Sequence, residues 1–163
     1  RLAFAGSNEQ PYQSVGRWLL DRGLIKDASW QGIKSWIVST QQSNPRLVQE
    51  MLWSNPRYVF FREEQRSPID EDLGPRGAQG VPLTAGRSVA VDKDSVPYAT
   101  PLWLVSQGPA GSLRRLVFAQ DTGSAIVGAV RADYFAGTGA AAGEWAGRVK
   151  QNLSLWVLWP KSP

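Results

Sequence analysis

The sequence predicts a mainly β fold with some α-helix, in which a small helical unit precedes a barrel or sandwich of short strands. Apolar residues recur at helical spacing through residues 12–54. From residue 57 onward, short runs rich in β-branched and aromatic residues alternate with turn signals. A chain of 163 residues is also long enough to bury a core. We therefore expect helices first and a sheet after them.

Three helices are expected after a loop over residues 1–11, which is rich in Gly, Ser, Asn and Pro. The first begins after Ser14 and ends at Gly23, because glycine supplies a C-terminal stop. The second has Ser29 as its N-cap. The third has Asn44 as its N-cap and a proline at its first helical position, and a second Asn-Pro pair ends it.

Short strands with turn signals between them are expected in the rest of the chain. A loop without periodicity, residues 65–82, separates the first strand from the others. Residues 132–150 suggest a Gly-rich loop that leads into a short helix. Several short strands at this spacing are typical of a small barrel or sandwich. The expected strands are residues 57–63, 87–91, 101–106, 113–120 and 153–159.

The composition restricts the chemistry that an active site can use. The chain has no cysteine and no histidine, which excludes disulfides, cysteine nucleophiles, His-based triads and Cys/His metal sites. Acid–base catalysis must then use carboxylates, Lys or Tyr. We expect no metal and no cofactor.

The charge pattern bears on the partners of the chain. A net charge of +4 is mildly basic and suits an anionic polymer. The charges are scattered rather than clustered, so no nucleic-acid partner is expected. No apolar run approaches the roughly 18–20 residues of a membrane span, so no transmembrane segment is expected in this chain.

The tetrapeptide Asp121-Thr122-Gly123-Ser124 is the string that carries the catalytic aspartate of aspartic proteases. That chemistry needs two aspartates that share one proton, supplied by two copies of the motif or by a homodimer. The chain has a single Asp-Thr-Gly and ends at residue 163, which leaves little room for a flap and a second half. An aspartic protease is therefore a distant third hypothesis.

Three aspartates, Asp92, Asp121 and Asp133, each fall where a predicted strand ends or a Gly-rich turn begins. One such aspartate alone is typical of a turn former or a solvated charge. Three of them, each in a distinctive local context, favour a functional site.

Five segments of the chain resemble the membrane-bound lytic murein transglycosylase A family, in order and over nearly the whole length. Residues 82–104, 119–128 and 130–150 resemble its three-aspartate domain, and residues 4–23 and 55–63 resemble the sequence before that domain. The resemblance implies a double-psi β-barrel preceded by the small helical unit.

Several residues depart from the pattern of the family. Near its first motif the family has Tyr-Ala-Gly-Lys-Asn-Gly, where this chain has Phe4, Ser7 and Glu9. The family also has a second glycine at the position of Ser124 and a basic residue at that of Val127. These departures bear on substrate contacts and leave the aspartates in place.

The resemblance divides the chain into two domains. Residues 1–66 correspond to the end of a glycan-binding domain plus the helical unit, and residues 67–163 to the three-aspartate barrel. Family members are longer, and their N-terminal stretch contributes part of the barrel and most of the glycan-binding domain. We expect that portion either to be absent or to form a separate chain.

The function implied by the resemblance is that of a peptidoglycan lytic transglycosylase, a carbon–oxygen lyase in cell wall turnover. It cleaves the β-1,4 bond between N-acetylmuramic acid and N-acetylglucosamine and leaves a 1,6-anhydro ring. The muramoyl 6-hydroxyl is the nucleophile, and its tethering gives an effective molarity on the order of 10⁵ M or more. One carboxyl group can therefore replace the usual pair. Glycan strands are the expected partner, in the periplasm and at the outer membrane.

Position in the motifs assigns the proton transfer to Asp133. Because a general acid must be protonated, we expect Asp133 to be buried or to lie beside another carboxylate. Asp121 would be that supporting neighbour, whereas Asp92 either supports the site or forms a barrel turn. The alternative function is a non-catalytic peptidoglycan-binding module. The expected substrate contacts are Gly6, Asn8, Gly123, Ser124, Gly137 and Gly139.

Overall fold

The computed structural model describes residues 2–65 and 73–161. The chain divides into two compact units, Arg1–Glu64 and Gln65–Pro163. The domain boundary expected from the sequence, between residues 66 and 67, lies outside the described residues.

The first unit holds a two-stranded antiparallel sheet, formed by β1 (Leu2–Ser7) and β2 (Val59–Glu63). The pairing is interrupted by a bulge between Phe4 and Gly6. The strand expected over residues 57–63 is confirmed, but the loop expected over residues 1–11 is wrong for its first part. Its strand forms because β2 pairs with it from far along the chain, and local composition does not predict such pairing.

Three helices lie between these strands in the sequence, and all three expected helices are confirmed. They are α1 (Val15–Asp21), α2 (Trp30–Gln41) and α3 (Pro45–Trp53). Each has an N-cap whose side-chain oxygen accepts a backbone N–H three residues later. Ser29 and Asn44 are the expected N-caps, and Ser14, the expected start of the first helix, caps α1. Their apolar faces form a separate small core of Leu19, Ile33, Val48 and Met51.

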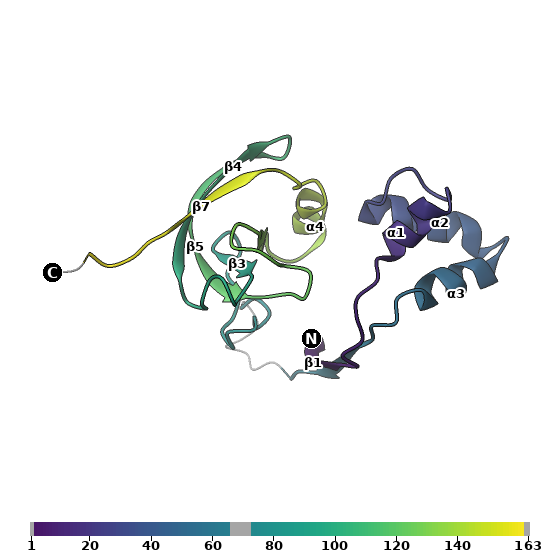
Figure 1. Ribbon diagram of the computed structural model, residues 1–163, viewed down its shortest axis with the longest axis horizontal. Coiled ribbons are helices and arrows are strands. Elements are labelled where there is room, and N and C mark those ends of the chain that lie inside the picture. The colour runs from purple at the N-terminus through teal and green to yellow at the C-terminus, as the bar shows by residue number, and fades with distance from the viewer. Residues whose placement is uncertain (1, 66–72, 162–163) are drawn as a thin grey trace. The chain divides into compact units, whose positions relative to one another are not determined.

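The second unit is built on a five-stranded mixed sheet in the order β6-β3-β5-β4-β7. The parallel pair β3–β5 lies among antiparallel pairs. Figure 1 shows β4, β5 and β7 curving around β3, as in part of a barrel. The strands are β3 (Ser88–Val91), β4 (Pro101–Gly108), β5 (Gly111–Asp121), β6 (Ala132–Tyr134) and β7 (Leu153–Val157).

The fold class expected from the sequence is confirmed: strands predominate, some helix is present, and the curled sheet is consistent with a double-psi β-barrel. In the second unit, the Gly-rich loop expected over residues 132–150 needs correction, because its start forms β6. This three-residue strand is held by its pairing with β3 rather than by its own composition. The short helix expected after it is α4 (Ala140–Ala146).

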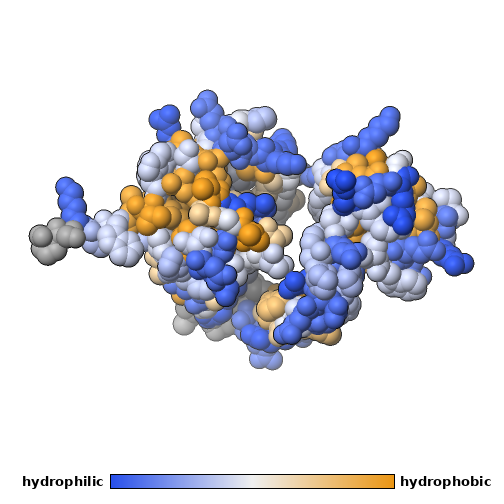
Figure 2. All heavy atoms as spheres, in the orientation of Figure 1, coloured by the Kyte–Doolittle hydropathy of each residue, from blue (hydrophilic) through white to orange (hydrophobic). Residues whose placement is uncertain are grey.

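The core of the second unit lies on the inner side of the curled sheet. Its buried residues come from β3, β4 and β5 and, with Val96, from the segment between β3 and β4, and Trp145 of α4 packs against them. The outer face is more apolar than a solvated sheet face, and Figure 2 shows hydrophobic surface over β4, β5 and β7. Exposed side chains of that region are Trp103, Phe118, Trp156 and Leu158.

Candidate active site

Asp121 and Asp133 lie on either side of Ala90 in the sheet. Ala90 of β3 pairs with Asp121 at the end of β5 and with Asp133 in β6. Neighbouring strands are about 4.8 Å apart, so the backbones of the two aspartates are separated by roughly 10 Å. The small side chain of Ala90 leaves the space between them open.

A β-bulge in β5 produces this arrangement. Val89 pairs with Ala119, but the next residue, Ala90, pairs with Asp121, so Gln120 is the extra residue. Bulges re-aim side chains and are frequent beside active sites. Here the bulge places Asp121 rather than Gln120 opposite Ala90.

Both aspartates line one cleft of about 280 Å³. Its floor and walls come from β3, from the end of β5 with the turn that follows it, and from β6. The remaining lining residues are Leu83, Ser88, Val89, Ala90, Thr122, Ile126, Tyr134 and Phe135. The mixture of apolar walls and two carboxyl groups is typical of a small-ligand site.

The Asp121 carboxylate is anchored by a loop that packs against the end of β5. Its Oδ1 accepts the backbone N–H of Ala78 at 2.9 Å. The same loop approaches the strand closely, since a Cβ on Gly77 would lie 2.3 Å from the carbonyl oxygen of Gln120. The position of the Asp121 carboxyl group is therefore set by backbone rather than by flexible side chains.

The Asp133 carboxylate has a different environment from the one expected. Its side chain is 54% exposed, and the Nε–H of Arg131 donates to its Oδ1 at 3.0 Å. The expected burial is wrong because β6 is an edge strand of the sheet. In the described structure, no neighbouring strand of the sheet covers β6 on its outer side, so the Asp133 side chain stays exposed there. The group that contacts Asp133 is a guanidinium, not a second carboxylate.

Asp92 is not among the residues that line the cleft. Its Oδ2 accepts the backbone N–H of Gly128 at 2.7 Å, and its Oδ1 accepts that of Asp94 at 3.0 Å. These backbone hydrogen bonds, with the Gly128 bond foremost, lower the pKa of Asp92 below its ordinary value. Asp92 is thus an ionised tether that fastens the turn after β5 to the end of β3.

Two of the expected substrate contacts, Gly6 and Asn8, belong to the first unit. Gly6 lies at the bulge in β1. The Asn8 amide bridges two segments of backbone, since its Nδ2 donates to the carbonyl of Pro56 at 2.9 Å and its Oδ1 accepts the N–H of Tyr58 at 2.8 Å. Both ends of the Asn8 side chain are therefore already engaged in holding the first unit together.

The other expected contacts lie in the loops around the cleft and do not line it. Gly123 and Ser124 belong to the turn after Asp121, where the N–H of Ile126 donates to the Gly123 carbonyl at 2.9 Å. Gly137 has a positive φ of 115°, and a Cβ there would lie 3.2 Å from that of Ala85. Gly139 is the N-cap of α4.

Sequence reasoning missed two residues of the cleft. Ser88 is fully buried, and its hydroxyl donates to Gln120 Oε1 at 2.5 Å and accepts the N–H of Thr84 at 2.8 Å. Tyr134 packs its ring against Trp145, with ring centroids 5.7 Å apart. Ser88 carries no sequence signal, whereas Tyr134 could have been found as the neighbour of Asp133.

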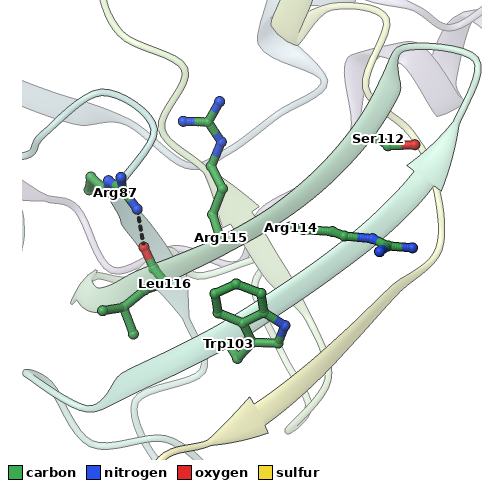
Figure 3. Close-up of a pocket in the computed structure, with 6 residues that line it drawn as sticks. All are labelled: Arg87, Trp103, Ser112, Arg114, Arg115 and Leu116. Atoms are coloured by element: carbon green, nitrogen blue, oxygen red, sulfur yellow. Dashed lines mark hydrogen bonds between the residues drawn. The ribbon is translucent and has the colours of Figure 1, made fainter.

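A second cavity, of about 500 Å³, is lined by three arginines. Figure 3 shows its lining, in which the side chains of Arg114 and Arg115 leave β5 in different directions. Arg87 donates from Nη1 to the carbonyl oxygen of Leu116 at 3.1 Å. Its lining residues are Arg87, Trp103, Ser112, Arg114, Arg115 and Leu116.

Two family models match the chain. Residues 87–159 match the 3D domain, and residues 1–62 match the MltA specific insert domain. All three aspartates lie within the first match.

Named relatives and solved structures cover nearly all of the chain. Membrane-bound lytic murein transglycosylase A of Vibrio cholerae is 33% identical over an alignment 166 residues long, which covers 96% of this chain and 42% of that protein. The crystal structure of MltA from Neisseria gonorrhoeae in its monoclinic form has a TM-score of 0.81 and 42% identity, and the match covers 98% of this chain and 40% of that one. The crystal structure of Escherichia coli MltA with bound chitohexaose has a TM-score of 0.78 and 30% identity, and the match covers 96% of this chain and 46% of that one. The chain thus spans less than half the length of these relatives.

Proposed function

Because the chain belongs to the membrane-bound lytic murein transglycosylase A family, we propose that it carries the acid–base centre of a lytic transglycosylase acting on peptidoglycan. The observation that carries the proposal is the pair Asp121 and Asp133, which flank Ala90 in one cleft. The substrate bond is the β-1,4 link from N-acetylmuramic acid to N-acetylglucosamine.

Asp133 is the group that transfers the proton. Its protonated carboxyl gives a proton to the glycosidic oxygen as the bond from that oxygen to C1 of the muramoyl ring breaks. The 6-hydroxyl of the same ring then attacks C1 and returns a proton to the Asp133 carboxylate. No water is consumed, and the enzyme ends in its starting state. The half-exposed position of Asp133 leaves its oxygens within reach of a glycan.

Asp121 has a supporting role. Positive charge develops at C1 and the ring oxygen in an oxocarbenium-like transition state. A carboxylate that is already fixed by the Ala78 N–H can stabilise this charge without reorganising. Asp92 acts indirectly, because its bond to the Gly128 N–H shapes the turn that follows Asp121.

The partner and location follow from the family. The E. coli relative has been crystallised with chitohexaose, which supports a glycan strand as the ligand of this cleft. The relatives are named membrane-bound, so we place the protein at the bacterial cell envelope, facing the periplasm and associated with the outer membrane. In the described part of the chain, no helix is long and apolar enough to cross a bilayer.

Mass spectrometry of the products released from murein sacculi tests the proposed function. The protein is expected to release muropeptides that end in 1,6-anhydro-N-acetylmuramic acid, which are lighter by one water than the products of hydrolysis. Reducing ends in place of anhydro ends would identify a hydrolase and contradict the proposal. Protein that sediments with sacculi but releases nothing would identify a non-catalytic wall-binding module.

A further inference from the structure

Arg115 of β5 and Tyr134 of β6 converge beside Gly86. A Cβ built on Gly86 would lie 3.1 Å from the Tyr134 hydroxyl and 3.2 Å from Nη1 of Arg115. Gly86 has a positive φ of 74°, and the absence of a side chain there lets both groups approach the backbone closely. Two hydrogen-bond donors from different strands therefore end beside the same glycine.

The residues around Gly86 are held in place by the fold. The N–H of Gly86 donates to the carbonyl of Phe135 at 2.8 Å, which fixes the segment before β3 against the end of β6. The Tyr134 ring packs on Trp145, whose Nε1–H donates to the carbonyl of Ala110 at 3.1 Å. The phenol is thus positioned before any ligand arrives.

Arg115 and the Tyr134 hydroxyl are both available for a ligand. Within residues 2–65 and 73–161, no carboxylate forms an ion pair with Arg115 and no hydrogen bond engages the Tyr134 hydroxyl. Figure 3 shows the Arg115 side chain rising from β5 on the side away from Trp103, and Arg114 extending in another direction. A cation and a neutral donor that end beside the same glycine are suited to a carboxylate.

The two donors line different cavities. Arg115 lines the basic cavity, whereas Tyr134 lines the cleft that contains the aspartates. Because the Tyr134 hydroxyl and the Arg115 guanidinium end beside the same glycine, a group that extends from a sugar in the aspartate cleft past Tyr134 approaches Arg115.

We propose that Arg115 and Tyr134 form a subsite for the carboxylate borne on the muramoyl branch of the substrate. This inference rests on the proposed function, which places a muramoyl sugar beside Asp133. The carboxylate has two chemical sources, the lactyl group of a peptide-free muramoyl sugar and the acidic residues of a stem peptide. Arg115 supplies the charge and a planar pair of N–H donors, and Tyr134 supplies an O–H donor.

Calorimetric binding of three glycans tests the subsite in the Asp133→Asn background, which prevents turnover. The probes are chitohexaose, which has no carboxylate, a peptide-free N-acetylglucosamine–N-acetylmuramic acid oligomer, and the same oligomer with its peptides. Arg115→Gln is expected to weaken binding of a carboxylate-bearing probe roughly tenfold, and Tyr134→Phe roughly threefold, with chitohexaose unchanged. A loss confined to the peptide-bearing probe assigns the subsite to the stem peptide. A loss confined to the peptide-free probe assigns it to the lactyl carboxylate, which the peptide-bearing probe carries only as an amide. A loss for both muramoyl probes shows that the subsite accepts a carboxylate from either source.

Arg114→Gln is the matched control, because it removes the same charge from the neighbouring position of β5. Equal losses in Arg114→Gln and Arg115→Gln would indicate general attraction to a cationic surface and would overturn the subsite. An equal loss with chitohexaose would overturn it as well. Arg115→Lys keeps the charge and checks that the fold tolerates a change here, and its affinity is expected to lie between those of wild type and Arg115→Gln.

The outcomes of this test and of the sacculus digestion are separable. Binding is measured without turnover, so a carboxylate-dependent affinity that Arg115→Gln abolishes would stand even if the protein released no anhydro product. If the protein released anhydro products but bound all three probes independently of a carboxylate, the proposed transglycosylase function would stand and the proposed carboxylate subsite would be overturned.

Discussion

At the scale of single residues, Asp121 and Asp133 are the same amino acid on opposite sides of Ala90, but different groups hold them. A backbone N–H fixes the Asp121 carboxylate at 2.9 Å. The Asp133 carboxylate is contacted by the side chain of Arg131, which is itself 53% exposed. A proton-transfer group must keep its oxygens accessible, whereas a group that stabilises developing charge must stay in place. The two environments suit the two roles.

Ala90 should be sensitive to size, because its side chain lies between the two aspartates and lines the cleft. Ala90→Leu is expected to lower kcat/KM on murein by about 100-fold, since its branched side chain occupies the place of the sugar. Ala90→Ser adds one oxygen and should stay within a few-fold of wild type. Steady-state release of anhydromuropeptides measures both, and a fully active Ala90→Leu would show that the glycan does not lie over Ala90.

Asp92 should make stability depend on pH. Because backbone N–H groups lower its pKa in the folded protein below the ordinary value of 3.8, its contribution is present above that pH and disappears as the pH falls through the lowered pKa. Asp92→Asn is therefore expected to have a lower thermal midpoint than wild type at pH 7. The difference between the two midpoints should narrow in the acid range below about pH 3.8. Thermal unfolding across pH checks this prediction.

Asp94→Asn is the control for that series. The Asp94 carboxylate is 85% exposed and lies 3.9 Å from Lys93, with no backbone N–H bound to it in the described structure. The thermal midpoint of Asp94→Asn should therefore stay close to that of wild type at every pH. If the difference in thermal midpoint between Asp92→Asn and wild type stayed constant across the acid range, the Asp92 carboxylate would not act as an ionised tether.

At the scale of elements, the signals that the sequence carries are local ones. The three helices of the first unit could be predicted because each cap residue acts on an N–H only three residues away. β1 and β6 could not, because each exists through pairing with a strand elsewhere in the chain. The bulge at Gln120 is of the same kind, so the motif indicated Asp121 but not the register that sets it opposite Ala90.

The loop that anchors Asp121 should tolerate no side chain at Gly77. A Cβ there would lie 2.3 Å from the carbonyl oxygen of Gln120 and 2.7 Å from Leu83 Cδ2, so loop or strand must move. Gly77→Ala is expected to lower the free energy of unfolding by about 1–3 kcal/mol. It should also lower activity on murein, because the Ala78 N–H shifts away from Asp121. Denaturant unfolding and product release measure the two effects.

Gly143→Ala is the matched control, since Gly143 lies in α4 and a Cβ there meets nothing within 4 Å. It should leave activity unchanged and stabilise the protein by up to about 1 kcal/mol, because alanine is the better helix former. If Gly77→Ala were as stable and as active as Gly143→Ala, the loop would not hold Asp121 in the way described.

At the scale of the whole molecule, the order of motifs along the chain was sufficient to indicate the family and the mainly β fold. It indicated the three aspartates and left Asp92 open between a supporting role and a barrel turn. In the structure Asp92 ties down a turn and does not line the cleft. The sequence also does not predict that the side chains of Arg115 and Tyr134 meet. These residues come from different strands and are brought together by the sheet order β6-β3-β5, and Gly86 lets both approach its backbone closely.

Proton transfer by Asp133, within the cleft that it shares with Asp121, is the central step of the proposed reaction. The direct test is the rate at which the protein releases anhydromuropeptides from sacculi after Asp133→Asn, with Asp94→Asn as a control that removes a carboxylate outside the cleft. Asp133→Asn should lower the rate by at least about 100-fold, with an unchanged thermal midpoint and retained binding to sacculi, while Asp94→Asn stays near wild type. Release of anhydro products by Asp133→Asn at the wild-type rate would contradict the account.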